Sequence, residues 1–294
     1  MGIEKLWSPE PIIAFQRFLG TGWERLFEGI SLLGSIPAIA IVFALALWLS
    51  GRRLAYGLLG AILLATLTDL LIWNLVSLPR PSDPRITLYI KKPVVSSFPS
   101  GHTVTATMLW GSLAAFNKLP IAVPIVIVLA MMPARLYLGV HYPGDLLGGV
   151  IIGTTLVVLY QRLWSKILPW FKSRPFRFFL TIGLAFPIGA LPVIFLSDRG
   201  WEVFGVALGA GIGMPLEHWY VHYSPAQVPR SKQALKVGIG LGVLAILGTI
   251  LYLTKDSSPV VNVVTLALAA LWITFLAPAL FSYMGLSQPS GRKF

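Results

Sequence analysis

The sequence predicts an all-α fold, a polytopic transmembrane helical bundle of about nine spans with an N-terminal interfacial helix. Apolar residues make up 56% of the 294 residues and charged residues only 12%, whereas soluble domains carry about 25% charged residues. Apolar runs long enough to cross a bilayer recur along the whole chain, and the charged residues gather between them. A chain with so little polar surface has lipid as its main solvent.

Apolar runs predict the individual spans, and one segment departs from this pattern. The segment 8–34 mixes charged residues such as Glu10 and Arg17 with apolar ones, which is typical of an amphipathic helix at the membrane interface. The Gly-Trp-Glu sequence at Gly22 is expected to split this helix in two. The predicted spans are residues 35–50, 56–78, 101–116, 120–140, 144–163, 177–196, 201–222, 234–254 and 260–284.

The net charge of +12 and the absence of cysteine restrict the functional classes. The basic residues form short clusters between apolar runs, where they act as topology signals and lipid-headgroup contacts. No nucleic-acid partner is therefore expected. Disulfides, thiolate catalysis and cysteine-bound metals are excluded. No removable signal peptide is evident, so the first spans are expected to direct insertion.

The charged loops form two sets that alternate along the chain, which assigns them to opposite sides of the membrane. The set rich in bases includes Arg52, Lys118 and Lys232, and the positive-inside rule places it in the cytoplasm. The loop 79–100 on the other side keeps four bases against this trend, and anion binding gives a reason for them. These bases are Arg80, Arg85, Lys91 and Lys92.

Three segments on that outer side carry ionisable groups at predicted helix ends, which favours a functional role. They are PRP at 79–81, FPSGH at 98–102 and ARLYLGVHYPGD at 134–145. Ser100 and Gly101 are predicted to open a helix, whose free backbone N–H groups attract anions. The arginines of the first and third segments, Arg80 and Arg135, suit phosphate oxygens.

Histidines and a carboxylate complete this group of residues. Asp145 follows His141 by four residues, within reach of one ring nitrogen, which would leave the other free to attack. A second histidine, His102, can protonate a leaving alkoxide. Each residue alone has an ordinary structural explanation, but their combination at one predicted surface indicates a phosphoryl-transfer site.

The pattern PSGH at 99–102, followed by Arg135, His141 and Asp145, resembles the type 2 phosphatidic acid phosphatase superfamily of membrane lipid phosphatases. The resemblance covers roughly residues 35–165. It implies that Arg80, Ser100, Gly101 and Arg135 bind phosphate. It also implies that His141 is the nucleophile, that Asp145 orients it, that His102 is the general acid, and that no metal or other cofactor takes part.

Two positions depart from the motifs of that superfamily. Trp73 stands where the first motif usually has lysine, and Ala134 stands where the third usually has serine. Lys91 and Lys92, in the same outer loop, are candidates for the missing phosphate-binding charge. Contact with lipid headgroups is the alternative explanation for both.

A second cluster, Glu217, His218 and His222, lies near the predicted cytoplasmic end of the seventh span. The two histidines have an i, i+4 spacing that can bind zinc with a third ligand. A structural role is favoured, because the cluster is predicted to lie a membrane's thickness from the chemistry. In that interpretation Glu217 pairs with a loop base such as Arg230 or Lys232.

The sequence therefore predicts an integral membrane hydrolase of a lipid phosphate or diphosphate, such as a prenyl diphosphate, phosphatidate or sphingoid phosphate. One alternative is a phosphatase or phosphotransferase for a soluble ester such as a sugar phosphate, and another is a transporter or scaffold with a degenerate site. We expect a multi-pass plasma-membrane protein whose site faces outward, or into the endoplasmic-reticulum lumen in a eukaryote. The expected division is 1–34 interfacial, 35–165 catalytic and 166–294 an accessory bundle of four spans.

Overall fold

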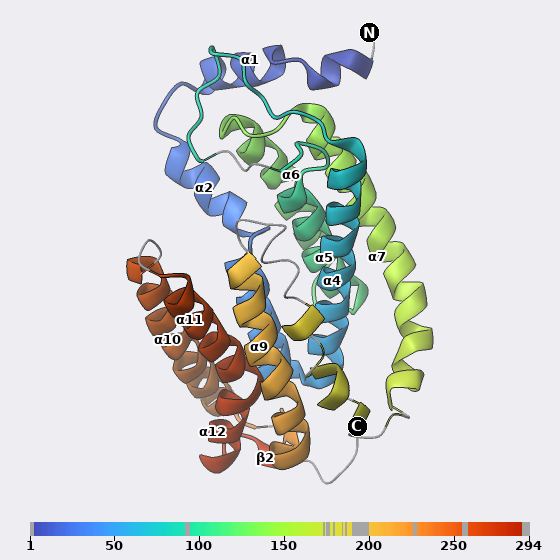
Figure 1. Cartoon of the computed structure of the whole chain (residues 1–294), viewed down its shortest axis with the longest axis vertical. Helices are drawn as coiled ribbons and strands as arrows, with labels where there is room; N and C mark the ends of the chain where they lie inside the picture. Colours follow the sequence, from blue (N-terminus) through green and yellow to red (C-terminus); the bar gives the residue numbers. More distant parts are fainter. Residues whose placement is uncertain are drawn as a thin grey trace. The chain divides into compact units, whose positions relative to one another are not determined.

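The computed structural model divides into two compact units, Met1–Phe43 with Tyr56–Ile167, and Ala44–Ala55 with Leu168–Phe294. We describe each unit by itself (Figure 1). The division predicted from the sequence, after residues 34 and 165, is a division by role. These two compact units do not test that division, which stays a prediction. The structure describes residues 3–91, 95–172, 174, 177–178, 180–183, 185, 187–189, 200–225, 228–254 and 258–289.

The first unit begins with three short helices, η1 (Ile3–Trp7), α1 (Glu10–Leu19) and α2 (Glu24–Leu32). Positive φ angles of 69° at Gly20 and 102° at Gly22 separate α1 from α2, so the predicted break is present. Helix α1 is amphipathic, because it buries Ile12 and Ile13 while the charged Glu10 and Arg17 stay exposed. It runs across one end of the helices that follow (Figure 1).

Longer helices form the body of the first unit. They are α3 (Ile36–Leu45), α4 (Arg52–Val76), α5 (Gly101–Ala115), α6 (Ala122–Tyr137) and α7 (Pro143–Lys172), with the ends of α3, α4 and α7 belonging to the second unit.

Glycines on α7 bring it close to α5. A Cβ atom at Gly149 would lie 2.8 Å from Cβ of Thr103, and one at Gly153 would lie 2.6 Å from Cβ of Thr107. This close packing holds the first turn of α5 beside the first turn of α7.

The second unit contains α-helices interrupted by π-helical turns. Its elements are η2 (Ala46–Ser50), α9 (Gly200–Leu216), η3 (Glu217–Val221), α10 (Arg230–Thr254), α11 (Pro259–Leu271), η4 (Trp272–Leu276) and α12 (Ala277–Tyr283). The short strands β1 (Tyr223–Ser224) and β2 (Gln288–Pro289) pair antiparallel. Helices α9 and α11 pack against each other.

Glu217 in the second unit pairs with Arg52 at 2.9 Å. The expected pairing of Glu217 with Arg230 or Lys232 was therefore wrong. Arg52 opens α4, immediately after the π-helical turn η2, and its Nη1 atom lies 3.3 Å from Nδ1 of His218. The cluster is thus built around a partly buried ion pair whose partners lie 165 residues apart in the chain.

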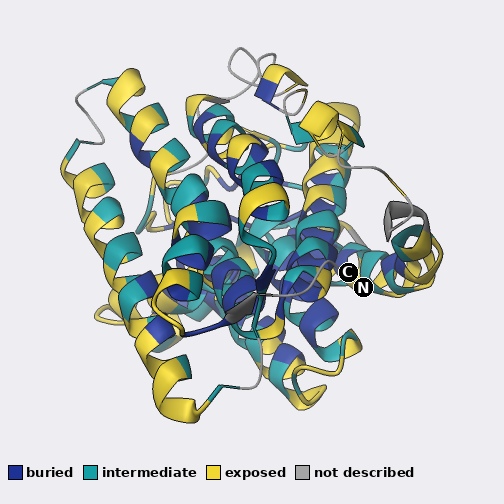
Figure 2. Ribbon diagram, turned by 90° about the horizontal axis from the view of Figure 1, so that it is seen from below, coloured by how far each residue is buried: buried dark blue, intermediate teal, exposed yellow. Residues whose placement is uncertain are grey.

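Side chains on the outward faces of the helices are largely apolar, as lipid-facing surfaces require. Figure 2 shows exposed residues along the outer faces and buried residues between the helices. On α4 the exposed leucines Leu63, Leu67, Leu71 and Leu75 recur every four residues, so they lie on one face. Together with the helical content, this confirms an all-α membrane protein.

The number of spans is not confirmed at nine. Among the described residues, four helices are long and apolar enough to cross a membrane: α4, Pro143–Pro169 of α7, α10 and the segment Pro259–Tyr283. A fifth span results if α2 and Ile36–Ser50, bent by 47°, form one crossing. Helices α5 and α6 match predicted spans but have only 15 and 16 residues. Half of the predicted span 177–196 lies outside the described residues.

Candidate active site

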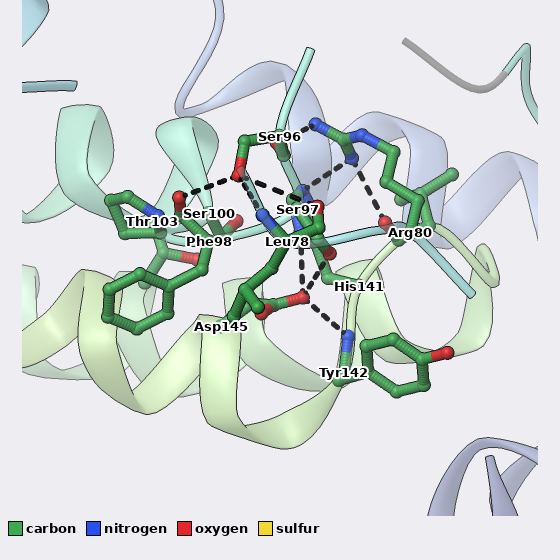
Figure 3. A network of polar contacts seen from close by, with 12 residues as sticks. Leu78, Arg80, Ser96, Ser97, Phe98, Ser100, Thr103, His141, Tyr142 and Asp145 are labelled. Carbon is green, nitrogen blue, oxygen red and sulfur yellow. Dashed lines mark hydrogen bonds and ion pairs between the residues drawn. The ribbon is translucent and has the colours of Figure 1, made fainter. Parts of the chain in front are cut away.

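Segments that are far apart in the sequence meet in one network of polar contacts in the first unit (Figure 3). The backbone N–H of Ser100 donates to the carbonyl of Asp145, in the first turn of α7, at 3.1 Å. The N–H of Ser97 donates to the carbonyl of Leu78, in the loop that carries Arg80, at 2.8 Å. Main-chain hydrogen bonds therefore fix the PRP, PSGH and third motifs against one another.

Asp145 is fully buried, and both of its carboxylate oxygens accept hydrogen bonds. Oδ1 accepts from Nε1 of Trp7 at 3.0 Å. Oδ2 accepts from the Ser97 hydroxyl and from the backbone N–H of Tyr142, the latter at 2.9 Å. These donors compensate for the loss of water around the carboxylate.

His141 lies between this carboxylate and Arg80, and its side chain is 1% exposed. Its Nε2 atom is 3.2 Å from Nη1 of Arg80. A guanidinium can only donate, so Nε2 is the unprotonated acceptor, and Nδ1 carries the ring proton. Nδ1 faces Oδ2 of Asp145 at 3.4 Å, a long separation of the kind that tightens in catalytic pairs when substrate binds. Nε2 therefore holds the lone pair that a nucleophile needs.

The protonation state of His141 fits that role. Burial lowers the pKa of its imidazole well below the usual value of 6.5, and the charges of Arg135 and Arg80 lower it further, against the raising effect of Asp145. The ring is therefore neutral at pH 7. Burial also lowers the pKa of the Arg80 guanidinium, to about 10, which leaves this side chain charged at the same pH.

Arg80 is held by several main-chain carbonyls besides its contact with His141. Nε donates to Val95 at 3.0 Å, Nη2 to Ser96 at 3.1 Å and Nη1 to Val140 at 3.0 Å. These bonds link the loop before α5 to the loop before α7. The guanidinium is thus fixed against Nε2 of the His141 imidazole.

Arg135, near the end of α6, adds a second buried positive charge with 2% exposure. Its Nη1 atom donates to the Ser31 hydroxyl of α2 at 2.8 Å, while among the described residues its Nε has no hydrogen-bond partner. The positive charges of Arg80 and Arg135 both act on the neutral imidazole of His141, which faces the Asp145 carboxylate with Nδ1. This excess of positive charge makes the site suited to an anion.

Ser100 and Gly101 lie where α5 begins, as predicted. Ser100 is the N-cap residue by position, but its side chain makes no capping hydrogen bond. Gly101 has a packing role that the sequence did not indicate, because a Cβ atom there would lie 2.9 Å from Cζ2 of Trp73. Trp73 itself donates from Nε1 to the carbonyl of Pro99 at 3.0 Å. The tryptophan therefore lies against the PSGH turn. His102 is the second residue of α5 and is partly exposed.

The remaining predicted residues are Lys91, Lys92 and the two histidines of the second cluster, and among the described residues none of them is shown in contact with His141, Arg80 or Asp145. Lys91 is exposed on the outer loop, and Lys92 lies outside the described residues. Within the described part of the chain, no group of three or more metal-binding side chains is present. His218 and His222 belong to the second unit, with ring centroids 6.4 Å apart.

Four residues near the site were not singled out from the sequence: Trp7, Ser31, Asp69 and Ser97. Trp7, Ser31 and Ser97 hydrogen-bond to predicted site residues, but no local pattern marks such long-range partners. Asp69 is 4% exposed, and its Oδ2 atom would lie 3.4 Å from a Cβ atom at Gly101. A carboxylate inside an apolar span is a signal that could have identified Asp69.

Comparisons with known proteins place these motifs in a family. The sequence model of the PAP2 superfamily matches residues 54–169, and that of the PAP2 superfamily phosphatase transmembrane extension matches residues 201–289. No solved structure matches the chain.

Curated relatives match parts of the chain. Decaprenylphosphoryl-5-phosphoribose phosphatase from Mycobacterium tuberculosis (strain ATCC 25618 / H37Rv) is 38% identical over 86 residues, which are 29% of this chain and 48% of that protein. The protein of the same name from Mycolicibacterium smegmatis is 35% identical over 112 residues, 38% of this chain and 61% of its own length. Human sphingosine-1-phosphate phosphatase 2 is 27% identical over 174 residues, covering 53% of this chain and 40% of the relative.

This chain therefore spans about half the length of the curated mycobacterial relative from M. tuberculosis. The two family models match the segment that carries all three motifs and most of the second unit. On these grounds the chain belongs to the PAP2 superfamily.

Proposed function

We propose that this chain is an integral membrane phosphatase that hydrolyses a lipid phosphate or diphosphate through a phosphohistidine intermediate on His141. The observation that supports this most strongly is the order Arg80, His141, Asp145 across the buried site, with separations of 3.2 Å and 3.4 Å. This order leaves a neutral nucleophile with its lone pair facing an arginine. When the phosphate group of a substrate binds, its oxygens would replace Nε2 of His141 as the partner of Arg80, which frees the Nε2 lone pair.

In the first half-reaction, the Nε2 lone pair of His141 attacks phosphorus and the bond from phosphorus to the leaving oxygen breaks. His102 gives its proton to the leaving oxygen, which departs as an alcohol or, from a diphosphate, as the phosphorylated product. Asp145 stabilises the positive charge that develops on the His141 ring. Arg80 and Arg135, with the Ser100 hydroxyl and the backbone N–H of Gly101 at the start of α5, hold the non-bridging oxygens.

In the second half-reaction, water attacks the phosphohistidine. His102, now neutral, takes a proton from that water, and the bond between phosphorus and Nε2 breaks. Inorganic phosphate leaves and His141 returns to its neutral form. Each group ends the cycle in its starting state, so the residues of the chain account for every proton in the reaction. Lys91 and Lys92 are proposed to supply part of the charge that Trp73 lacks.

A lipid substrate is supported by the surroundings of the site and by the relatives. The site lies at the ends of helices whose outward faces are apolar, such as the leucine face of α4, so a lipid in the bilayer can present its headgroup there. The curated relatives are named for decaprenylphosphoryl-5-phosphoribose and sphingosine 1-phosphate. Both names denote a phosphate group on a molecule with a long apolar part.

The proposal also includes the roles of the three segments and the orientation of the chain in the membrane. We propose that residues 35–165 carry the catalytic bundle, that 1–34 lie at the interface, and that 166–294 form an accessory bundle within a total of nine spans. The positive-inside rule supports a site that opens on the extracytoplasmic face. The membrane that we propose is the plasma membrane.

The test is phosphate release by the purified protein in lipid nanodiscs. Prenyl diphosphates, phosphatidate, sphingoid phosphates and sugar phosphates form the panel. We expect a lipid substrate to be preferred and its phosphate to appear on the protein in an acid-labile, base-stable form after rapid quenching. The labelled form should be absent from His141→Ala. Undiminished phosphate release by His141→Ala would refute the mechanism, and a preference for sugar phosphates would refute the substrate class.

A further inference from the structure

The N-terminal helix η1 reaches the catalytic carboxylate from outside the region that the catalytic family model matches. Nε1 of Trp7 donates to Oδ1 of Asp145 at 3.0 Å, across 138 residues of sequence. The match to that family model begins at residue 54. Trp7 is therefore a contribution of this chain's own N-terminal segment to the centre of the site.

The two oxygens of Asp145 have different partners. Oδ2 receives the Ser97 hydroxyl and the Tyr142 N–H and faces the His141 ring. The only hydrogen bond to Oδ1 among the described residues comes from Trp7. A carboxylate can rotate about its terminal torsion, which has a broad energy profile. A donor on Oδ1 opposes that rotation and keeps Oδ2 directed at Nδ1 of His141.

The position of the indole depends on the absence of a side chain at Gly144. A Cβ atom at Gly144 would lie 2.5 Å from Cε2 and 2.6 Å from Cζ2 of Trp7, so the ring lies directly on this backbone. The indole also contacts Phe98 of the loop before α5, with ring centroids 6.1 Å apart and planes tilted by 59°. Trp7 therefore packs against both segments that carry the histidines.

The segment that carries Trp7 is itself fixed to the outer loop and to α6. Nε2 of Gln16 on α1 donates to the carbonyls of Thr87 at 2.8 Å and Tyr137 at 2.7 Å, and its Oε1 accepts from the Thr87 N–H at 3.0 Å. Gln16 is buried. These bonds, made by a buried amide to backbone groups, give η1 and α1 a defined place over the site.

From this geometry we propose that Trp7 is a positioning residue for the reaction, acting through its indole N–H on Asp145. The proposal rests on the proposed phosphatase function. Without the Trp7 N–H, the Asp145 carboxylate can rotate, so that Oδ2 no longer stays directed at Nδ1 of His141. The carboxylate then stabilises less well the positive charge that develops on the imidazole during attack. Binding of the phosphate group depends on Arg80 and Arg135 instead. The effect therefore falls on kcat and on the rate of phosphoenzyme formation, and KM changes little.

Two variants remove the N–H in different ways. Trp7→Phe keeps an aromatic ring over Gly144, and replacement of Trp7 by 3-benzothienylalanine keeps the full shape of the indole with sulfur in place of the N–H. We expect both to lower kcat about 10- to 100-fold, the range for a hydrogen bond to a charged group. Trp110→Phe is the matched control, because its Nε1 also makes a hydrogen bond within the first unit, to Leu33 at 2.9 Å. This control should stay within about twofold of the wild type, the small effect usual away from such sites.

The outcomes separate positioning from packing. If the benzothienylalanine protein matches the wild type while Trp7→Phe is impaired, the indole acts by packing alone and the proposal is wrong. Equal kcat in all the variants also overturns it. A parallel loss in Trp110→Phe would show that tryptophan replacement damages the fold in general, and this result too contradicts a specific role.

A measurement that does not depend on turnover separates this proposal from the proposed function. In protein with 15N-labelled indoles, the Nε1–H resonance missing from Trp7→Phe is that of Trp7. It should shift in Asp145→Asn, and the Trp110 resonance should stay in place. An unmoved Trp7 resonance refutes the contact. If instead the wild type releases no phosphate from any substrate of the panel, the proposed function fails, while a shifted resonance still supports Trp7 as the residue that holds Asp145.

Discussion

Nη1 of Arg80 lies 3.2 Å from Nε2 of His141, so the arginine contacts the lone pair that attacks phosphorus in the proposed reaction. The same side chain donates to three backbone carbonyls, those of Val95, Ser96 and Val140. Arg80 therefore links the loops around His141, and in the proposed reaction it also presents a positive charge to the substrate. A lysine cannot reproduce this fork of donors.

Arg80→Lys should lower kcat/KM by about 100-fold or more, because several hydrogen bonds of a buried charge are lost together. Arg85→Lys is the matched control in the same outer loop. Arg85 pairs with Asp83 and Glu10 on the surface, and its side chain is 52% exposed, so its replacement should change kcat/KM by less than about twofold. Steady-state kinetics on the preferred lipid test both. An Arg80→Lys protein as active as the wild type would show that the arginine does not hold the phosphate.

The pH dependence of kcat/KM reports the protonation of free His141. Burial and the two arginines lower the pKa of this imidazole below its usual 6.5, so the reactive neutral form persists as the pH falls below neutrality. Activity should therefore be lost only on acidification well below pH 6.5, when a proton occupies Nε2. The measurement is kcat/KM between about pH 4 and 8, corrected for ionisation of the substrate followed by phosphorus NMR. An acid limb at or above pH 6.5 contradicts the assignment.

Ser31→Ala should raise KM with a smaller effect on kcat, because the Ser31 hydroxyl holds Arg135 at 2.8 Å. Because Ser31 acts on the phosphate only through Arg135, we expect KM to rise about 5- to 10-fold, less than the loss of a direct hydrogen bond to a charged group. Ser35→Ala is the control, since among the described residues its hydroxyl bonds only to the nearby Leu32 carbonyl, and the residue is partly exposed. Inhibition by vanadate provides a second measurement, and its inhibition constant should rise in parallel with KM. Equal KM in Ser31→Ala and Ser35→Ala would show that Ser31 does not position Arg135.

The missing motif lysine gives a fourth prediction. Nε1 of Trp73 donates to Pro99 at 3.0 Å and its ring lies against Gly101, so a lysine at this position starts beside the PSGH turn. Lys91→Gln with Lys92→Gln should raise KM for an anionic substrate several-fold at low salt, and less at high salt. Adding Trp73→Lys should restore part of the loss. A double variant that matches the wild type at both salt concentrations would assign the two lysines to lipid headgroups.

Local features of the site could be predicted from the sequence, because they depend on short spacings. His141 and Asp145 are four residues apart around a helix start, and Gly101 follows a cap residue, so both arrangements are local. The partners that complete the site are not local. Asp145 takes its Oδ1 donor from Trp7, and Arg135 takes its hydroxyl partner from Ser31, 104 residues away. No periodicity indicates which of ten tryptophans reaches a carboxylate.

The helix boundaries show the same limit for the fold. Hydropathy identified α4 and α10, because each is a continuous helix of 25 residues with an apolar body, but both begin at an arginine four residues before the predicted start. Helix α6 ends at Tyr137, three residues before the end predicted for that span, since the chain there turns into the loop that presents His141. The partner of Glu217 was mispredicted, because Arg52 is far away in sequence while Arg230 and Lys232 are near. Hydropathy identifies helices, but it does not identify which charges meet between them.

The last prediction concerns the side of the membrane on which the chemistry takes place. Helix α7 connects the site to the opposite side, because Asp145 lies in its first turn and Ser165 lies near its other end. Positions 143 and 165 are 22 residues apart in this helix, which at about 1.5 Å per residue is about 33 Å, enough to cross the hydrocarbon core.

Because the chain has no cysteine, single replacements can report both ends of α7. Ser82→Cys lies on the exposed part of the loop that carries Arg80, and Ser165→Cys is exposed near the basic residues Arg162 and Lys166. An impermeant thiol reagent applied to intact cells should label the first and spare the second, because basic segments stay in the cytoplasm. Labelling of both after permeabilisation shows that each thiol is accessible. The reverse pattern in intact cells would place the site on the cytoplasmic leaflet, and the substrate would then have to be a lipid of that leaflet.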